Sequence, residues 1–168
     1  MGRSGSVMKE YKKCQALSKR EVVKHKPNKS TLLISIQDGD KSELPFKQRT
    51  NHITRSQYVD VLFCYFDDLD PIRLGCIFSS PFLFSRADAK RIINFLNRHF
   101  QNPSSFDQVL VHCQAGISRS QAVALFVAKY YYKDEELYRE LMENAVLPEG
   151  NKYIFQILEE EFFNQKGS

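Results

Sequence analysis

The sequence lacks most features of secreted, membrane-bound or metal-binding proteins. Its four cysteines, at positions 14, 64, 76 and 113, form no Cys-x2-Cys pair, which argues against a zinc site and a disulfide scaffold. No stretch approaches the roughly 18 consecutive apolar residues of a membrane span. Residues 1–30 are polar and basic, without the apolar core of a secretory signal. We therefore expect a cytoplasmic protein in a reducing compartment.

Length and charge favour one folded domain with a basic start. A chain of 168 residues is typical of a single domain. Residues 1–30 hold nine Lys/Arg and two Glu, a net charge of +7, whereas the rest holds 15 basic and 18 acidic residues, net −3. Such a start can attract RNA, anionic lipid or phosphorylated partners, or it can simply be a solvated terminus. We expect residues 1–15 to be a basic, partly disordered arm and residues 16–168 to be the domain.

The run from Val109 to Ala124 carries the strongest chemical signal. It predicts a short apolar strand, then a loop from Cys113 to Arg119, then an apolar helix. A loop that short, entering a helix, can curl so that its backbone N–H groups converge on one point. Such a ring of dipoles binds an anion, and the helix N-terminus adds to the positive field. Gly116 suits a position where the backbone turns tightly.

Two side chains of this run would complete a site for a phosphate dianion. Arg119 can present a planar fork to two phosphate oxygens, a geometry that lysine cannot match. We expect the positive field of the loop to favour the thiolate of Cys113, which would then be a nucleophile at neutral pH. The alternative is a buried structural cysteine at the end of a core strand.

At these residues the chain resembles the cysteine-dependent protein tyrosine phosphatase superfamily, and its small dual-specificity-like or atypical members in particular. The signature His-Cys-x5-Arg-Ser/Thr matches at His112, Cys113, Arg119 and Ser120. The resemblance implies an α/β fold, a single domain with a central, mostly parallel β-sheet flanked by helices, and a catalytic domain over residues 16–168. It also implies that the loop binds the substrate phosphate, through Gln114, Ala115, Gly116, Ile117, Ser118 and Arg119.

The residues that flank the loop have supporting roles in this resemblance. The hydroxyl of Ser120 would hydrogen-bond the sulfur and ease its departure, and it could also be a simple helix-start hydroxyl. The ring of His112 would organise the loop, and it could equally be a satisfied core residue. Because the loop carries the positive charge itself, we expect neither a metal ion nor another cofactor.

The general acid is expected in the acidic cluster after the strand at residues 58–66. Phe66-Asp67-Asp68 is similar to the Phe-Asp-Asp or Phe-Glu-Asp of small dual-specificity-type members, in which the second acid is catalytic. We therefore favour Asp68, with Asp67 second and Asp70 a distant third, while a solvated acidic turn is the non-catalytic alternative. Asp68 and Cys113 are 45 residues apart, longer than in compact members, so we expect extra loop within residues 71–84.

Periodicity and capping signals predict the order of elements. A β-rich run at residues 31–36 is followed by a turn at 37–40 and an irregular, polar stretch at 44–57. The spacing of Ser85 and Asp88 predicts a capping box. The other expected elements are a strand at 107–112, a buried helix at 119–132, a helix capped by Asp134 and a final amphipathic helix capped by Asn151.

The resemblance implies a hydrolase for phosphorylated protein substrates, with phosphotyrosine as the default and phosphoserine or phosphothreonine as additions. The loop contains no lysine, whereas phosphoinositide phosphatases of this superfamily tend to have lysines there, so the resemblance disfavours phosphoinositides. Two alternatives stay open: an RNA 5′-phosphatase, which the basic arm weakly favours, and an inactive phosphopeptide-binding module. We expect a monomer. Cys64 and Cys76 raise a redox hypothesis, because some members of the family protect the oxidised nucleophile through a disulfide with a nearby cysteine. Cys64 could lie on a strand next to the one that ends at Cys113, but an ordinary core residue is the favoured alternative.

Overall fold

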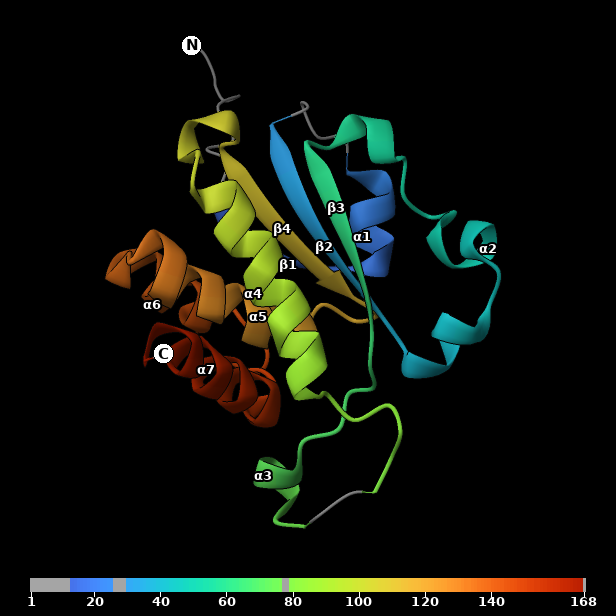
Figure 1. The fold of residues 1–168 in the computed structure, drawn as a ribbon, viewed down its shortest axis with the longest axis vertical. Helices are drawn as coiled ribbons and strands as arrows, with labels where there is room; N and C mark the ends of the chain where they lie inside the picture. Colours follow the sequence, from blue (N-terminus) through green and yellow to red (C-terminus); the bar gives the residue numbers. More distant parts are fainter. Residues whose placement is uncertain (1–12, 26–29, 77–78, 168) are drawn as a thin grey trace.

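A four-stranded parallel sheet forms the centre of the protein (Figure 1). In this computed structural model the described residues are 13–25, 30–76 and 79–167. The strand order is β1-β4-β2-β3, and every neighbouring pair runs parallel. The expected single α/β domain with a central parallel sheet is confirmed, and its strands are β1 (Cys14–Ser18), β2 (Thr31–Gln37), β3 (Asp60–Tyr65) and β4 (Gln108–Cys113).

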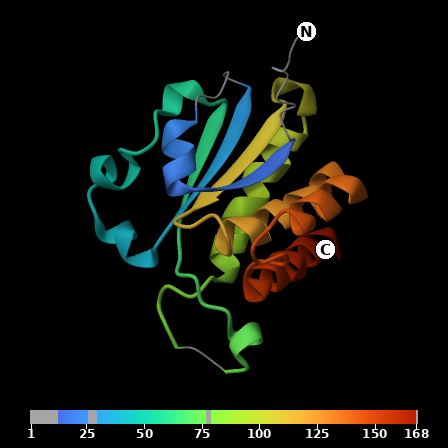
Figure 2. The same ribbon diagram turned by 180° about the vertical axis from the view of Figure 1, so that it is seen from behind.

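Helices cover both faces of the sheet. One face carries the longer helices, with α4 crossing the front in Figure 1, and the opposite face carries α1, which Figure 2 shows from behind. None of the helices in the described part of the chain is long and apolar enough to cross a membrane. The helices are α1 (Lys19–Lys24), α2 (Phe46–Thr50), α3 (Pro71–Leu74), α4 (Arg86–Phe100), α5 (Arg119–Val127), α6 (Glu135–Glu143) and α7 (Lys152–Gly167).

The two faces of the sheet bury two cores of different size. The larger core packs strand residues such as Ile34 and Val111 against α4, α5, α6 and α7. The smaller core packs Leu33 and Leu110 against Val22 of α1 and the segment before β3. Because successive residues of a strand point to opposite faces, β2 and β4 serve both cores, and all their residues are buried.

The capping signals predicted the helix starts correctly. Ser85 and Asp88 form the reciprocal capping box of α4, and the side chain of Asp134 accepts a hydrogen bond from the N–H of Leu137. The side-chain oxygen of Asn151 accepts from the N–H of Ile154 in α7. These bonds satisfy backbone donors that the first helical turn leaves unpaired. Helix α5 is buried at every residue, as expected for a helix that is apolar all round.

Several segments differ from the sequence-based expectations. The turn after β2 continues as a 3-10 helix over Gly39–Glu43, and the stretch at 44–57, expected to be irregular, contains α2 and a 3-10 turn. Helix 119–132 ends as α-helix at Val127 and continues as a π-helical turn over Ala128–Tyr132. Strand β1 begins at Cys14, and α1 follows it through a capping box on Ser18. Strand β1 thus begins within residues 1–15, which were expected to form an arm. Both elements are short and lie in a Lys/Arg-rich stretch, so the apolar pattern that would predict them is weak. Residues 1–12 lie outside the described residues.

Candidate active site

The loop from Cys113 to Arg119 joins the end of β4 to the start of α5. The sulfur of Cys113 lies 3.2 Å from the backbone nitrogen of Gly116 and 3.1 Å from the hydroxyl oxygen of Ser120. Both groups can donate a hydrogen bond to the sulfur. The side chain is almost fully buried, yet it lines the pocket at the carboxyl ends of the strands.

On one side the loop rests on the β1–α1 corner. Gly116 has a φ of +74°, and a Cβ there would lie 2.5 Å from the backbone nitrogen of Ser18. The N–H of Lys19 donates to the carbonyl of Gln114 at 3.1 Å. Glycine is therefore required at position 116 both by the backbone angle and by this close approach.

On its other side the loop is held by the segment before α7. The carbonyl of Ser118 accepts hydrogen bonds from the N–H groups of Ala122 and Asn151, both at 3.1 Å. Gly150, with a φ of +64°, approaches so closely that a Cβ would lie 2.6 Å from the Ser118 carbonyl oxygen. Residues far apart in the sequence thus fix the loop from both sides.

The guanidinium of Arg119 is anchored beneath the loop. It is buried, and its Nη1 donates to the carbonyl oxygen of Phe66 at 2.8 Å and pairs with the carboxylate of Asp38 at 2.9 Å. Its Nε is buried and has no hydrogen-bond partner among the described residues. An unpaired buried donor is costly, and a bound phosphate oxygen would supply its acceptor. Sequence analysis missed Asp38, although it follows β2 directly and so lies at the same sheet edge as the loop.

The three candidate acids occupy three different environments. The exposed carboxylate of Asp68 lines the pocket with Cys113 and accepts from the hydroxyl of Ser118 at 2.7 Å and the side-chain amide of Asn151 at 2.9 Å. The carboxylate of Asp67 accepts from the N–H of Gly39 at 2.8 Å. Asp70 caps α3 and accepts from the N–H of Lys152 at the start of α7, which is a structural role.

His112 points away from the pocket and into a polar network of the smaller core. Its Nδ1 lies 3.2 Å from the carbonyl oxygen of Cys113, which can only accept, so Nδ1 carries the proton. Its Nε2 is therefore an acceptor, and it lies 2.6 Å from the hydroxyl of Ser35 and 3.2 Å from Nε2 of His52. The His52 ring nitrogen also lies 3.2 Å from the Ser35 hydroxyl.

Both histidines of this network are held neutral. Burial lowers the pKa of His112 to about 3, and the charges of Lys19 and Arg119 contribute in the same direction. Burial lowers the pKa of His52 to about 4, and Lys19 again adds to the effect. When both rings are neutral, His52 can donate to the Ser35 hydroxyl and that hydroxyl can donate to Nε2 of His112. Nδ1 of His112 then donates to the carbonyl oxygen of Cys113. Sequence analysis did not find Ser35 or His52, because neither belongs to a motif.

The pocket above the sulfur has a volume of about 440 Å³. Loop residues Gln114, Ala115, Ile117 and Ser118 line its floor together with Cys113 and Arg119, whereas Gly116 faces β1. Leu74 and Leu147 add apolar walls. Arg73, another residue that sequence analysis missed, also lines the pocket; its side chain pairs with Asp70 and donates to the carbonyl of Gly150.

The hypothesis that Cys64 lies on a strand next to the one that ends at Cys113 is wrong, and the favoured alternative, an ordinary core residue, is confirmed. Strand β2 separates β3 from β4, and Cys64 is in register with Ile36 of β2. Two strand spacings amount to about 10 Å, beyond the roughly 7 Å limit between Cα atoms for a disulfide. Cys14 and Cys64 are buried thiols whose pKa values burial raises to about 12.

Comparisons with known proteins support the fold. A family model described as the Rit1 DUSP-like domain matches residues 84–156, less than half of the chain. A comparison with curated protein sequences gave no significant match. Among solved structures, Tk-PTP in a mutant form superposes with a TM-score of 0.52 and 16% identity over 95% of each chain.

Two further solved structures agree. Tk-PTP in its active form gives a TM-score of 0.50 at 16% identity, over 88% of this chain and 87% of that chain. The human tyrosine phosphatase-like serine/threonine/tyrosine-interacting protein gives a TM-score of 0.51 at 18% identity, over 89% of this chain and 84% of that chain. The chain therefore has a protein tyrosine phosphatase-like fold.

Proposed function

We propose that this protein is a phosphomonoester hydrolase that acts on phosphotyrosine in proteins through a phosphocysteine on Cys113. One observation carries the proposal. The sulfur of Cys113 lies at the floor of a pocket whose lining also includes the guanidinium of Arg119 and the carboxylate of Asp68. A nucleophile, an oxyanion-binding cation and a proton donor are the groups that a two-step phosphoryl transfer requires.

In the first step the Cys113 thiolate attacks phosphorus and the bond from phosphorus to the leaving oxygen breaks. The loop N–H groups and Arg119 hold the three non-bridging oxygens. The anchors of Arg119 on Asp38 and on the Phe66 carbonyl fix one side of the guanidinium, which leaves Nε for the phosphate. Protonated Asp68 gives its proton to the leaving oxygen.

In the second step water attacks the phosphocysteine and the sulfur–phosphorus bond breaks. Asp68, now a carboxylate, accepts a proton from this water and is restored as an acid. The hydroxyl of Ser120, 3.1 Å from the sulfur, donates to the thiolate as it leaves. The products are inorganic phosphate and the resting enzyme, and the cycle needs no metal ion or other cofactor.

The walls of the pocket favour an aromatic leaving group. Leu74, Ile117 and Leu147 line the pocket, and Leu74 and Ile117 are also partly open to solvent. Apolar walls around a polar floor suit a phenyl ring that carries a phosphate. The open rim also leaves room for phosphoserine and phosphothreonine as dual-specificity substrates.

An RNA 5′-phosphatase is the second candidate. The matching family model bears a name that refers to initiator tRNA, and it covers β4, the loop and α5. An inactive phosphopeptide-binding module is the third. The three side chains that a pseudophosphatase would lose, Cys113, Arg119 and the acid, are all present in the pocket.

One experiment separates the three candidates. Phosphate release is measured for the wild type and for Cys113→Ser, with a phosphotyrosine peptide and a 5′-triphosphorylated RNA as parallel substrates. We expect release from the peptide, complete loss in Cys113→Ser, and a phosphorylated Cys113 peptide in acid-quenched wild type. Release from the RNA alone would support the second candidate. A wild type as inert as Cys113→Ser that still binds the peptide would support the third.

A further inference from the structure

Basic and acidic residues are unevenly distributed along the sequence of this protein. Residues 41–65 and 86–100 together hold eight Lys/Arg and three Asp/Glu, a net charge of +5. Residues 101–167 hold six Lys/Arg and ten Asp/Glu, a net charge of −4. Such segregation gives a surface a field of one sign and selects partners of the opposite charge.

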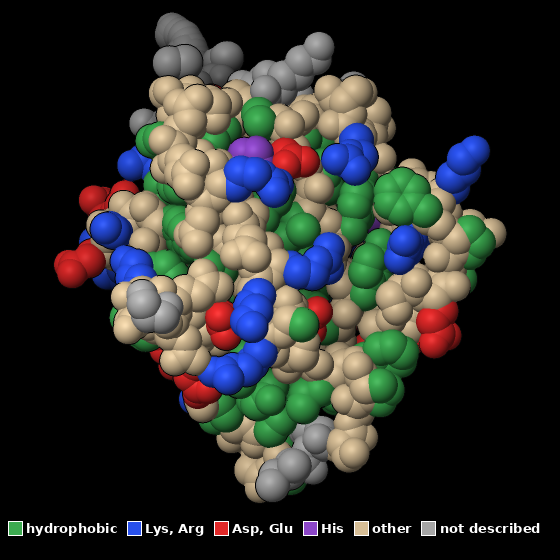
Figure 3. Space-filling model, viewed as in Figure 1, with side chains coloured by type: hydrophobic (Ala, Val, Ile, Leu, Met, Phe, Trp, Pro, Cys, Tyr) green, Lys and Arg blue, Asp and Glu red, His purple; other side chains and the backbone are tan. Residues whose placement is uncertain are grey.

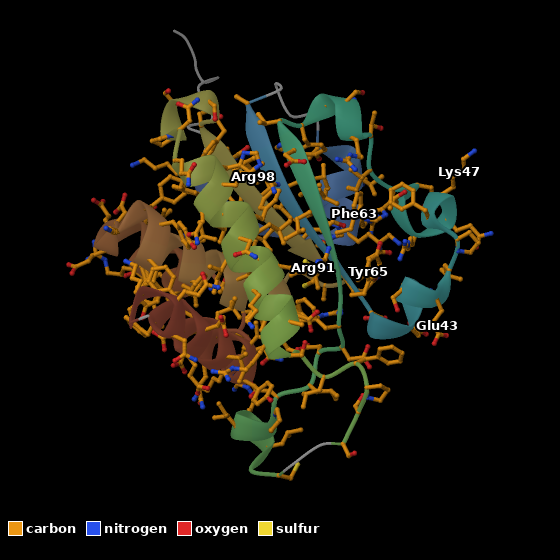
Figure 4. All side chains as sticks on the ribbon, viewed as in Figure 1. Glu43, Lys47, Phe63, Tyr65, Arg91 and Arg98 are labelled. Atoms are coloured by element: carbon orange, nitrogen blue, oxygen red, sulfur yellow. The ribbon has the colours of Figure 1, made fainter. Side chains whose placement is uncertain are left out.

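The two basic segments meet across the edge strand β3. Figure 4 shows Arg91 and Arg98 on α4, Phe63 and Tyr65 on β3, and Lys47 on α2, and the same face is seen as a space-filling surface in Figure 3. Arg91 donates to the carbonyl oxygen of Phe63 at 2.9 Å. Arg98 pairs with Asp60 at 3.1 Å. We call the face formed by Phe46, Lys47, Arg49, Tyr65 and Arg91 the β3 face.

The cations of the β3 face are not neutralised by the neighbouring carboxylate of Asp60. Asp60 is shared by Arg55, Arg98 and His99. No carboxylate in the described ranges forms an ion pair with Lys47, Arg49 or Arg91. Their positive charges are therefore not neutralised by an ion pair, although Arg91 donates to the carbonyl oxygen of Phe63 and Arg49 donates to that of Ser42 at 3.2 Å.

Aromatic rings alternate with the cations on this face. The guanidinium of Arg49 lies 5.5 Å from the ring centroid of Phe46 and 5.2 Å from that of Tyr65. Phe46 is 54% exposed, although its ring also packs edge-on against Phe63. Exposed rings beside cations are what proteins use to stack bases and hold the phosphates of single-stranded nucleic acids.

Two polar atoms at the centre of the face have no partner. The Nε of Arg49 and the hydroxyl of Tyr65 are both buried and lack a hydrogen-bond partner among the described residues. Unsatisfied buried donors are rare in proteins and need an explanation. A phosphate oxygen could accept from both, once the Arg49 side chain turns outward.

Another strand would fit this edge poorly. The carbonyl of Phe63 is already taken by Arg91, and the ring of Phe46 lies against Phe63. A peptide that paired with β3 would have to displace both contacts. We propose that the β3 face binds single-stranded nucleic acid, with cations on the phosphates and Phe46 stacked on a base.

The test uses fluorescence anisotropy of the full chain with a labelled, single-stranded oligouridylate that carries 5′- and 3′-hydroxyl ends. Lys47→Gln/Arg91→Gln should weaken binding about tenfold and reduce the slope of log K against log salt by about 1.4. Phe46→Ala should weaken binding about tenfold without changing that slope. The matched control, Lys133→Gln/Lys166→Gln, removes the same charge outside this face and should leave binding unchanged.

The proposal is overturned if the wild type does not bind the oligonucleotide or if the control pair weakens binding as much as the β3-face pair. It is also overturned if phosphatidylserine vesicles or an acidic peptide bind this face and the oligonucleotide does not. Duplex RNA of matched length should bind more weakly than the single strand, and equally tight binding of the duplex would overturn the proposal. Turnover of a small aryl phosphate should be unchanged in all variants, so a failure of the proposed hydrolase is recognised separately.

Discussion

The side-chain amide of Asn151 donates a hydrogen bond of 2.9 Å to the carboxylate of Asp68. The oxygen of the same amide caps α7 by accepting from the N–H of Ile154 at 3.0 Å. One side chain therefore fixes both the start of the last helix and the position of the candidate general acid. Sequence analysis expected only the cap.

Replacement of Asp68 by Asn should remove the proton donor that we propose. We expect kcat for a phosphotyrosine peptide to fall by about 10²–10⁴-fold and the basic limb of the pH–rate profile to disappear. Asp67→Asn is the matched control, because the remaining side-chain oxygen can still accept from the N–H of Gly39. Loss of the basic limb in Asp67→Asn instead would assign the acid to Asp67.

Replacement of Asn151 by Asp should keep the helix cap and change the charge beside the acid. Aspartate is as good a cap as asparagine. A second carboxylate near Asp68 disfavours loss of its proton, so the basic limb of the pH–rate profile should move to higher pH. Asn151→Ala is the comparison: it should cost about 1 kcal/mol in unfolding free energy through the lost cap. An unmoved limb in Asn151→Asp would show that the two side chains are not coupled.

Replacement of Gly116 by Ala should distort the loop from Cys113 to Arg119, which we propose binds phosphate. The new Cβ would meet the backbone of Ser18 at 2.5 Å, so the loop must shift. We expect activity to fall at least 100-fold, since small displacements of reacting groups have effects of about this size. Gly75→Ala is a close control, because Gly75 also has a positive φ, +66°, but nothing lies within 4 Å of the added Cβ. That variant should lose about 1 kcal/mol of stability and keep its activity.

The buried histidines should make the protein less stable in mild acid. His52 has a pKa of about 4 in the folded protein, against 6.5 for an ordinary histidine. Between these values the unfolded chain binds a proton that the folded protein does not, so unfolding is favoured as the pH falls. The contribution of the neutral His52 ring to the free energy of unfolding is fully present above pH 6.5 and is lost as the pH falls to about 4. Urea midpoints at pH 7.5 and 5 should therefore differ less in His52→Gln than in the wild type; equal differences would contradict this.

The four thiols should differ sharply in reactivity. Cys76 is exposed and Cys113 lines the pocket, whereas Cys14 and Cys64 are buried with raised pKa values. Iodoacetamide should label two cysteines in the native wild type and one in Cys113→Ser, as read by peptide mass spectrometry. After mild peroxide treatment we expect no crosslink between Cys113 and Cys64, because β2 lies between their strands. Detection of that crosslink would show that the sheet opens.

Contacts between residues that are close in the sequence explain why some elements could be predicted. Cys113, Arg119 and Ser120 lie together because one strand, one loop and one helix follow each other directly in the sequence. The caps at Ser85 and Asp134 depend on neighbours three residues away. In each case the determining contacts are short-range.

The residues that sequence analysis missed depend on strand order. Asp38 reaches Arg119 because β2 lies beside β4, and the same neighbourhood places Ser35 against His112. The mistaken placement of Cys64 has the same origin, since alternation of apolar residues does not specify which strand lies at the edge. Length and composition do not reveal this order either.

The close approach of Gly150 to the Ser118 carbonyl predicts an order in which the loop is completed during synthesis. During synthesis the segment that carries the nucleophile leaves the ribosome well before residues 150 and 151. Until those residues are synthesised, the Ser118 carbonyl lacks the hydrogen bond from the Asn151 N–H, and the carboxylate of Asp68 lacks the hydrogen bond from the Asn151 side-chain amide. Under the proposed function, a nascent chain should therefore stay inactive toward phosphorylated substrates until α7 has docked.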